Sequence, residues 1–175
     1  MENFHDLIVK RRSIRKYTEE PLSAEDVKTI LEAALLSPAG KSKNPWHFIV
    51  VEDKEVLEQL SHAKKHGATP LKNASLAIVV LGEPIISDTW VEDTSIACTM
   101  IQLQCEDLGL GSCWIHMRNR FTEAGQESED AVRNILDIPY SIDVLAVIAI
   151  GHKNEEKKPH DTENLQWEKV HIGKW

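Results

Sequence analysis

Apolar residues at helical spacing alternate along this chain with short runs of consecutive apolar, β-branched residues. The helical spacing predicts helices near residues 4–8, 23–37, 54–65, 89–108 and 127–136. The nearly continuous apolar runs are typical of strands buried on both faces and occupy 75–81 and 144–150. Shorter strand patterns lie at 46–51 and 112–116. This mixture predicts an α+β layered fold around a sheet of four or five strands.

Several element ends carry local signals. Ser23 is a candidate N-cap, and Glu25 and Asp26 follow it in the first helical turn. Pro38 cannot continue that helix cheaply, so the helix is expected to end near residue 37. The Gly-Leu-Gly motif at 109–111 follows a helix and precedes a strand, which is the wrong order for a dinucleotide fingerprint. Gly109 is therefore predicted to be a helix C-cap.

Composition narrows the class of protein. The chain has 175 residues, which fits one domain over 1–175, and its formal net charge is −8. Such an acidic balance argues against nonspecific nucleic-acid binding. The longest apolar runs are too short to span a bilayer, and the first residues lack the pattern of a signal peptide. With an odd number of cysteines beside apolar residues, the sequence predicts a cytoplasmic protein with reduced thiols.

Two pairs of residues at helical spacing are explained without a metal site. Cys98 and Cys105 are seven positions apart on one predicted helix and are expected to pack in its apolar face. His62 and His66 stand four positions apart, but the two lysines between them make a metal site electrostatically poor. We expect a solvated helical face there and no metal site, and no Ser/His/Asp arrangement is evident.

A cluster of basic residues near the N-terminus is the clearest candidate for binding. Arg11, Arg12 and Arg15 surround Ser13 within the segment 11–17, in a chain that is otherwise acidic. Guanidinium groups match the geometry of phosphate, and a hydroxyl adds a further donor. Taken alone, the cluster is also explained as a solvated basic patch at the end of a helix.

Two further segments carry polar residues in unusual settings. The loop 38–44 lies between a predicted helix and a strand and offers backbone N–H groups and short side chains to a planar polar ligand. An ordinary helix-to-strand connection explains it equally well. The polar tail 152–175 contains Trp167 and Trp175, which are not expected to remain in water. We interpret this tail as an arm that packs on a partner subunit.

Four of these segments, in this order, resemble the nitroreductase family of FMN-dependent oxidoreductases. They are RRSIRKY at 11–17, SPAGKSKNPWHF at 37–48, LGLGSCWI at 108–115, and IAIG at 148–151 with the tail that closes in VHIGKW at 170–175. The first is similar to the family's Arg-(Arg/His)-Ser-x-(Arg/Lys) segment. The match extends from about residue 4 to the C-terminus.

The resemblance implies a three-layer sandwich with a mixed or antiparallel sheet, in an intertwined homodimer with FMN in the interface. It places the FMN phosphate and ribityl chain on Arg11, Arg12 and Ser13, and the pyrimidine end of the flavin near Arg15. The loop of the other subunit would pack along the isoalloxazine ring through Pro38, Ala39, Gly40, Lys41, Ser42 and Asn44. The segment passing near the flavin N5 would be Trp114, Ile115 and His116. A basic residue of the tail would meet the phosphate, with Lys157, Lys158 and His160 as candidates.

The activity implied is that of an FMN-dependent NAD(P)H oxidoreductase. Hydride would pass from NAD(P)H through flavin N5 to a nitroaromatic, quinone or similar acceptor in a ping-pong cycle, and the flavin would carry the chemistry without a catalytic side chain. Other flavin chemistry of the same superfamily (dehalogenation, dehydrogenation or flavin destruction) and a non-catalytic flavin-binding dimer are the alternatives. Ala39, Ser42 and Asn44 depart from the usual Ser, Asn and Gln of the family loop, which affects flavin contacts and substrate access.

Overall fold

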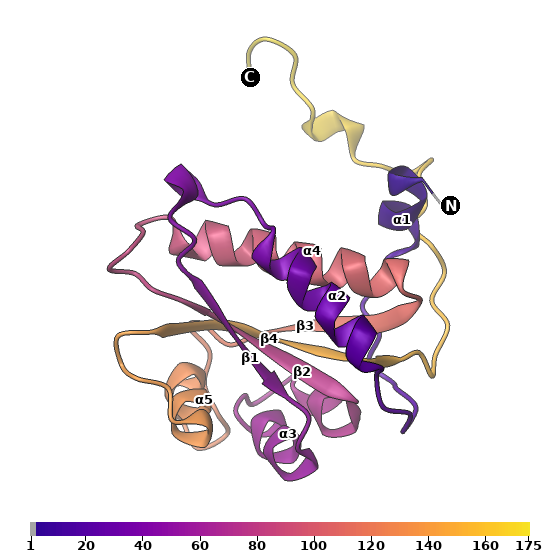
Figure 1. Ribbon diagram of the computed structural model, residues 1–175. Coiled ribbons are helices and arrows are strands. Elements are labelled where there is room, and N and C mark those ends of the chain that lie inside the picture. Colours follow the sequence, from indigo (N-terminus) through magenta and orange to yellow (C-terminus); the bar gives the residue numbers. More distant parts are fainter. Residues whose placement is uncertain (1–2) are drawn as a thin grey trace.

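The computed structural model describes residues 3–175 and is built on a single antiparallel sheet. Its strands are β1 (Trp46–Val51), β2 (Leu76–Gly82), β3 (Leu110–His116) and β4 (Asp143–His152). They lie in the order β1-β2-β4-β3, so β1 and β3 form the two edges (Figure 1). The predicted α+β fold with four or five strands is confirmed.

Helices cover both faces of the sheet and make three layers (Figure 1). One face carries α2 (Ala24–Leu35) and the long α4 (Trp90–Asp107), with α1 (Phe4–Lys10) packed against α4. The other face carries α3 (Lys54–Ser61) and α5 (Ser128–Leu136). Among the helices of residues 3–175, none has the length and apolar character needed to cross a membrane.

The two central strands bury side chains on both faces and so divide the core into two clusters. Ala77 and Val79 of β2 face α3 and α5, whereas Leu76 and Ile78 face α2 and α4. Every residue of β2 is buried. Because each large apolar side chain buried this way contributes about 1.5–3 kcal/mol, the continuous apolar runs seen in the sequence are also the main source of stability.

The predicted helix ends are largely confirmed by local geometry. Ser23 accepts a hydrogen bond from the Asp26 N–H at 3.0 Å, as an N-cap does. Gly109 has a φ of +74° directly after α4, which a residue with a Cβ adopts only under strain. The strand predicted at 112–116 begins two residues earlier, at Leu110.

The helix predicted over 54–65 ends early, at Ser61. His62 N–H and Ala63 N–H donate to Gln59 and Leu60 carbonyls in a tightened last turn. The chain then pairs with another loop, because the Lys65 N–H donates to the Phe121 carbonyl at 2.9 Å. His62 and His66 therefore do not share one helix, and the four-residue spacing between them does not place them on a common face.

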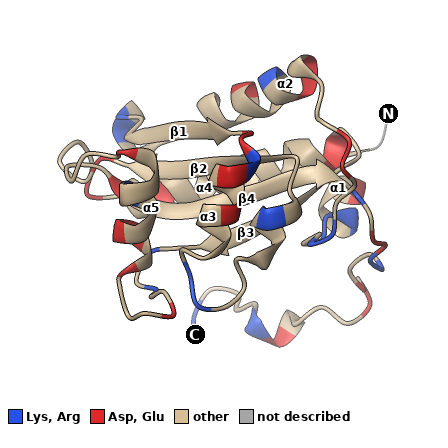
Figure 2. Cartoon of the chain, turned by 90° about the horizontal axis from the view of Figure 1, so that it is seen from below, with Lys and Arg blue, Asp and Glu red and all other residues tan. Residues whose placement is uncertain are grey.

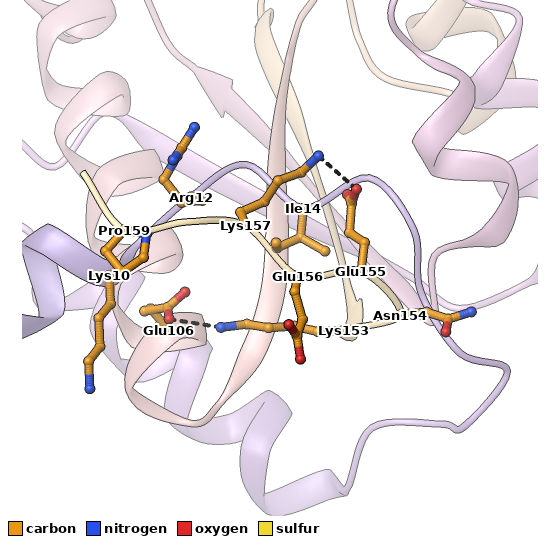
Figure 3. Close-up of a pocket in the computed structure, with 10 residues that line it drawn as sticks. All are labelled: Lys10, Arg12, Ile14, Glu106, Lys153, Asn154, Glu155, Glu156, Lys157 and Pro159. Atoms are coloured by element: carbon orange, nitrogen blue, oxygen red, sulfur yellow. Dashed lines mark hydrogen bonds and ion pairs between the residues drawn. The ribbon is translucent and has the colours of Figure 1, made fainter. Parts of the chain in front are cut away.

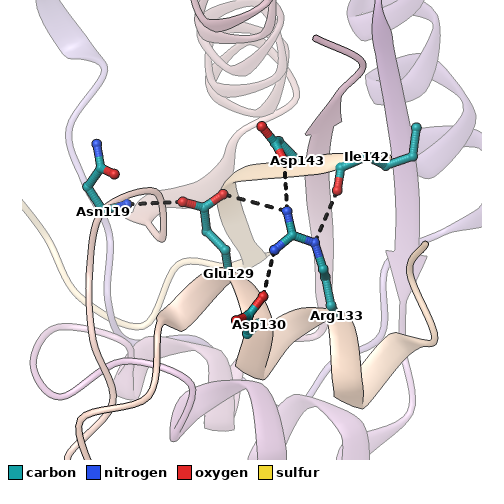
Figure 4. A network of polar contacts seen from close by, with 6 residues as sticks. All are labelled: Asn119, Glu129, Asp130, Arg133, Ile142 and Asp143. Atoms are coloured by element: carbon teal, nitrogen blue, oxygen red, sulfur yellow. Dashed lines mark hydrogen bonds and ion pairs between the residues drawn. The ribbon is translucent and has the colours of Figure 1, made fainter. Parts of the chain in front are cut away.

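A buried arginine fixes α5 to the sheet (Figure 4). Arg133 is 8% exposed and lies 2.8 Å from both Asp130 and Asp143, while its Nε donates to the Ile142 carbonyl at 3.2 Å. Glu129 stands 4.0 Å away on the same helix. Removing one member of such a network leaves uncompensated buried charge, so the network positions α5 at the start of β4.

Candidate binding site

The basic segment 11–17 lies along the free edge of β3. Ser13 forms a parallel bridge with Ser112, and the Ile14 N–H donates to the Ser112 carbonyl at 2.9 Å. The buried Tyr17 hydroxyl lies 2.6 Å from the Ile14 carbonyl oxygen and holds the far end of the segment. A Cβ at Gly111 would lie 2.7 Å from the Ile14 side chain, so glycine is needed for this close approach. The arginines are thus held beside the edge strand β3.

The C-terminal tail closes over the same segment from the other side. The Asn154 N–H donates to the Lys16 carbonyl at 2.9 Å, and the Arg12 guanidinium donates to the Lys158 carbonyl. The His160 N–H donates to the Val9 carbonyl at 2.8 Å. The structure therefore brings Lys158 and His160 to the N-terminal arginines, from which they are separated by most of the chain.

A cavity of about 720 Å³ lies between the basic segment and the tail (Figure 3). Its lining side chains are mostly charged and come from both parts of the chain and from the end of α4: Lys10, Arg12, Ile14, Glu106, Lys153, Asn154, Glu155, Glu156, Lys157 and Pro159. Lys153 pairs with Glu106 at 2.8 Å, and Lys157 pairs with Glu155 at 2.9 Å. Charged residues therefore surround the cavity, which suits a charged ligand.

Glu155 connects the tail to the main chain of the basic segment. Its Oε1 accepts the Arg15 N–H at 2.5 Å. That hydrogen bond and the Lys157 ammonium lower the pKa of Glu155 below its usual value. The carboxylate thereby holds the Arg15 backbone in place, a role that the sequence did not indicate because 140 positions separate the partners.

The second half of β3 presents alternating groups to its free edge and to the core. The Ile115 side chain is 1% exposed and lies in the core, and its backbone N–H and C=O face β4, so Ile115 offers no polar group at the free edge. Trp114 and His116 stack with their ring centroids 6.4 Å apart. Because the Ser112 carbonyl faces away from β4 and strand groups alternate, the N–H groups of Trp114 and His116 also face the free edge.

The electrostatics along β3 reflect the nearby cations. Burial raises the pKa of the Cys113 thiol, and the neighbouring Arg15 guanidinium opposes that rise. Partial burial lowers the pKa of His116, and the charges of Arg120 and Lys64 lower it further. A positive potential therefore extends from the basic segment along the edge strand.

The loop 38–44 has a strained backbone. Lys41 and Ser42 both have a φ of +54°, and Asn44 has a φ of +47°. Left-handed backbone costs a residue with a Cβ roughly 1–2 kcal/mol. Three such residues in one short loop persist only where surrounding contacts hold them, and strain of this kind gathers at ligand-binding loops.

A buried carboxylate provides that hold. Asp93, which is 3% exposed in the first turn of α4, accepts the Gly40 N–H at 2.8 Å. It also accepts the Thr89 hydroxyl at 3.2 Å and the Ser87 hydroxyl at 3.4 Å. A Cβ at Gly40 would lie 2.6 Å from the Thr89 hydroxyl oxygen. Sequence reasoning missed Asp93, because an acidic residue near a helix start is ordinary.

The strained loop and the basic segment lie at opposite ends of α4 (Figure 1). The loop is fixed at Asp93, whereas the cavity beside the basic segment contains Glu106. At a rise of 1.5 Å per residue, these two positions are about 20 Å apart along the helix. One chain therefore does not bring the two halves of the predicted site together.

Comparison with known proteins identifies the relatives of this chain. The family model described as the nitroreductase family matches residues 8–80 and 62–152. The chain belongs to the nitroreductase family. The resemblance seen in the sequence is therefore confirmed.

Nitroreductase relatives match over nearly the whole chain. A provisionally named NADH dehydrogenase/NAD(P)H nitroreductase of Archaeoglobus fulgidus is 39% identical over 100% of both chains. A protein of the same name from Methanothermobacter thermautotrophicus is 32% identical over 97% of this chain and 86% of its own. The solved structure of an FMN-dependent nitroreductase from Clostridium difficile R20291 is 45% identical, with a TM-score of 0.94 over 97% of this chain and 98% of that one.

Proposed function

We propose that this nitroreductase-family protein is an FMN-dependent NAD(P)H oxidoreductase that reduces a nitroaromatic, a quinone or a similar acceptor. The observation that carries the proposal is the position of the basic segment between the edge of β3 and the C-terminal tail, beside a cavity lined by Arg12 and by lysines and glutamates of the tail. A similar solved structure, at 45% identity, is that of an FMN-dependent nitroreductase. Bound FMN would supply the two-electron chemistry, accepting hydride at N5 and passing it to the acceptor.

The residues present fit FMN at its charged end. Arg11, Arg12 and Ser13 would hold the phosphate, since guanidinium groups bind phosphate through paired, charge-assisted hydrogen bonds. Lys158 and His160 are the tail residues available to join them, because the tail is tied to Arg12 and to the end of α1. The rigid strand contact at Ser112 pre-orders these donors before a ligand arrives.

The residues also fit a planar ring system beside β3. Arg15 would stand at the pyrimidine end, where a cation stabilises negative charge on the ring. The outward N–H groups of Trp114 and His116 would face the ring edge, and Ile115 would lie between them with its amide toward β4. Hydride transfer needs no acid or base of the protein, so the work of these side chains is to orient the ring and set its potential.

We propose that the second half of the site comes from another copy of the chain. The loop 38–44 lies about 20 Å along α4 from the basic segment. A two-fold dimer with antiparallel α4 helices would set the loop of one chain against the arginines of its partner. The tail supports the same arrangement, since Trp167, Ile172 and Trp175 are 66%, 96% and 101% exposed on one chain.

The direct test is the visible absorption spectrum of the purified protein, recorded without oxygen before and after addition of NADH or NADPH. A two-band flavin spectrum that bleaches with either nucleotide supports the proposal. A flavin spectrum that does not bleach moves the function to other flavin chemistry of the superfamily or to a non-catalytic flavin dimer. Protein that stays colourless after incubation with FMN refutes the proposal.

The shared site is tested by complementation between two variants. Arg11→Ala/Arg12→Ala removes the phosphate donors, and Asp93→Ala releases the loop, so each variant alone is expected to lose FMN on gel filtration. Mixing them through a cycle of unfolding and refolding yields heterodimers in which one of the two sites has an intact arginine pair and an intact loop. Recovery of bound FMN supports the shared site, and no recovery contradicts it. Lys28→Ala, an exposed change on α2, is the control.

A further inference from the structure

A second group of cations lies beyond the basic segment, where β3 ends. Lys64 follows α3, and Arg118 and Arg120 follow β3. The two loops are joined by the hydrogen bond from the Lys65 N–H to the Phe121 carbonyl at 2.9 Å. His116, the last residue of β3, lies among these charges. Acidic residues colour α3 and α5, and the loops beside them carry both basic and acidic residues (Figure 2).

These cations differ in the contacts that they already make within the chain. Arg118 lies 5.5 Å from the centre of the Trp90 ring, and Lys65 pairs with Glu123 at 3.3 Å. Arg120 donates from Nη1 to the Asn119 carbonyl at 2.8 Å, which leaves its other donors for a partner. Within residues 3–175, neither Lys64 nor Arg120 forms an ion pair with a carboxylate. Two cations are therefore held near each other with no anion between them.

The nearest carboxylate of α5 is committed elsewhere. Glu129 accepts the Asn119 N–H at 3.2 Å and stands 4.0 Å from Arg133. Burial and then the charge of Arg120 lower the pKa of Lys64, and burial and then the charges of Arg120 and Lys64 lower the pKa of the His116 imidazole. In a chain of net charge −8, such a concentration of positive charge favours a small anion.

We propose that Lys64 and Arg120 form a subsite for an anionic group, a carboxylate or a phosphate, on the molecule that docks beside Trp114 and His116. The inference rests on the proposed function, because that function places the reacting end of the substrate along this strand. Ser112, which pairs with Ser13, and His116 are about 13 Å apart along β3 at 3.3 Å per residue. The subsite is thus offset from the phosphate donors and can act on a second ligand.

The functional test compares matched substrates that differ by one anionic group. Acceptors are 4-nitrobenzoate and its methyl ester, and reductants are NADPH and NADH, with Lys64→Gln and Arg120→Gln as variants. For each pair we take the ratio of kcat/KM for the substrate with the anionic group to kcat/KM for the substrate without it. We expect this ratio to fall by roughly tenfold in each variant, which corresponds to the loss of one charge-assisted hydrogen bond. A fall for the acceptor pair identifies a carboxylate of the acceptor, and a fall for the nucleotide pair identifies the 2′-phosphate of NADPH.

Lys65→Gln is the matched control, since it removes a neighbouring cation that is already paired with Glu123. The proposal is overturned if neither ratio falls in the two test variants, or if Lys65→Gln lowers the same ratio equally. FMN absorbance of each variant is measured alongside, so that loss of flavin is not read as loss of selectivity.

A binding measurement tests the subsite independently of catalytic turnover. Addition of sodium benzoate to the wild-type protein is expected to raise the pKa of His116, followed by NMR of its ring protons, because a bound anion offsets the cations that lower it. The rise should be absent in Lys64→Gln/Arg120→Gln. If the pKa of His116 does not rise in the wild type, the subsite is overturned. If the protein fails to bind FMN, the proposed function is overturned, and this titration still decides whether the anion subsite exists.

Discussion

Replacing Asp93 with alanine tests whether the strained loop 38–44 serves the cofactor. The change deletes the acceptor of the Gly40 N–H and of two hydroxyl groups. The Ser87 and Thr89 hydroxyl oxygens are 3.0 Å apart and can satisfy each other, so the main loss is the amide. An amide left without a partner costs about 1–3 kcal/mol. We therefore expect the free energy of unfolding in urea to fall by about 2 kcal/mol.

The effect on FMN should exceed what this loss of stability explains. The left-handed residues Lys41, Ser42 and Asn44 are held against roughly 1–2 kcal/mol of strain each, so a loop without its anchor relaxes to other conformations. Re-ordering the loop on binding would then weaken the affinity for FMN by at least about tenfold, corresponding to 1.4 kcal/mol. Flavin fluorescence quenching measures this dissociation constant directly.

Two companion variants make the result interpretable. Asp93→Asn keeps an oxygen for the Gly40 N–H and is expected to retain most of the affinity. Glu92→Ala removes an exposed carboxylate from the adjacent position and should change neither quantity. If Asp93→Ala loses stability but binds FMN as the wild type does, the loop is not part of the cofactor site, and our reasoning about its strain is refuted.

Three other predictions address the fold and the segment 11–17. Arg133→Ala leaves the partly buried carboxylates of Asp130 and Asp143 without their cation and should lower the free energy of unfolding by about 1–3 kcal/mol, which urea denaturation measures and an added Asp143→Asn should partly restore. Gly111→Ala should push Ile14 from β3 and reduce FMN retention on gel filtration, since the new Cβ would lie 2.7 Å from the Ile14 side chain; unchanged retention would contradict this. The pKa of Glu155 is lowered by its contacts to Arg15 and Lys157, so their stabilisation is present above its unfolded value of 4.5 and is lost as the pH falls through the lower, folded value. Proteolysis of the tail should therefore quicken in strong acid for the wild type, and Glu155→Gln should show fast cleavage at neutral pH as well.

The sequence predicted the elements of the fold because their signals are local. The strand at Trp46–Val51 lies where the sequence predicted it, and α2 begins after the capping hydroxyl of Ser23. The helix after Asp53 was predicted too long, since polar residues such as Lys64 fit a helix and a loop equally well. Its end is set instead by a hydrogen bond to a loop more than 50 positions away, at Phe121. Helix propensity does not depend on such a distant contact, so it cannot predict where this helix ends.

The candidate site was predictable in its residue types and not in its geometry. The arginines and the loop stand out by composition, and the family resemblance gave them roles. The contacts that hold them, such as Glu155 to the Arg15 N–H and Asp93 to the Gly40 N–H, join positions 140 and 53 residues apart. Each uses an ordinary surface-type residue that no periodicity marks. In one chain α4 keeps the two motifs about 20 Å apart, and this separation is the reason we propose that each motif meets its complement on a second chain.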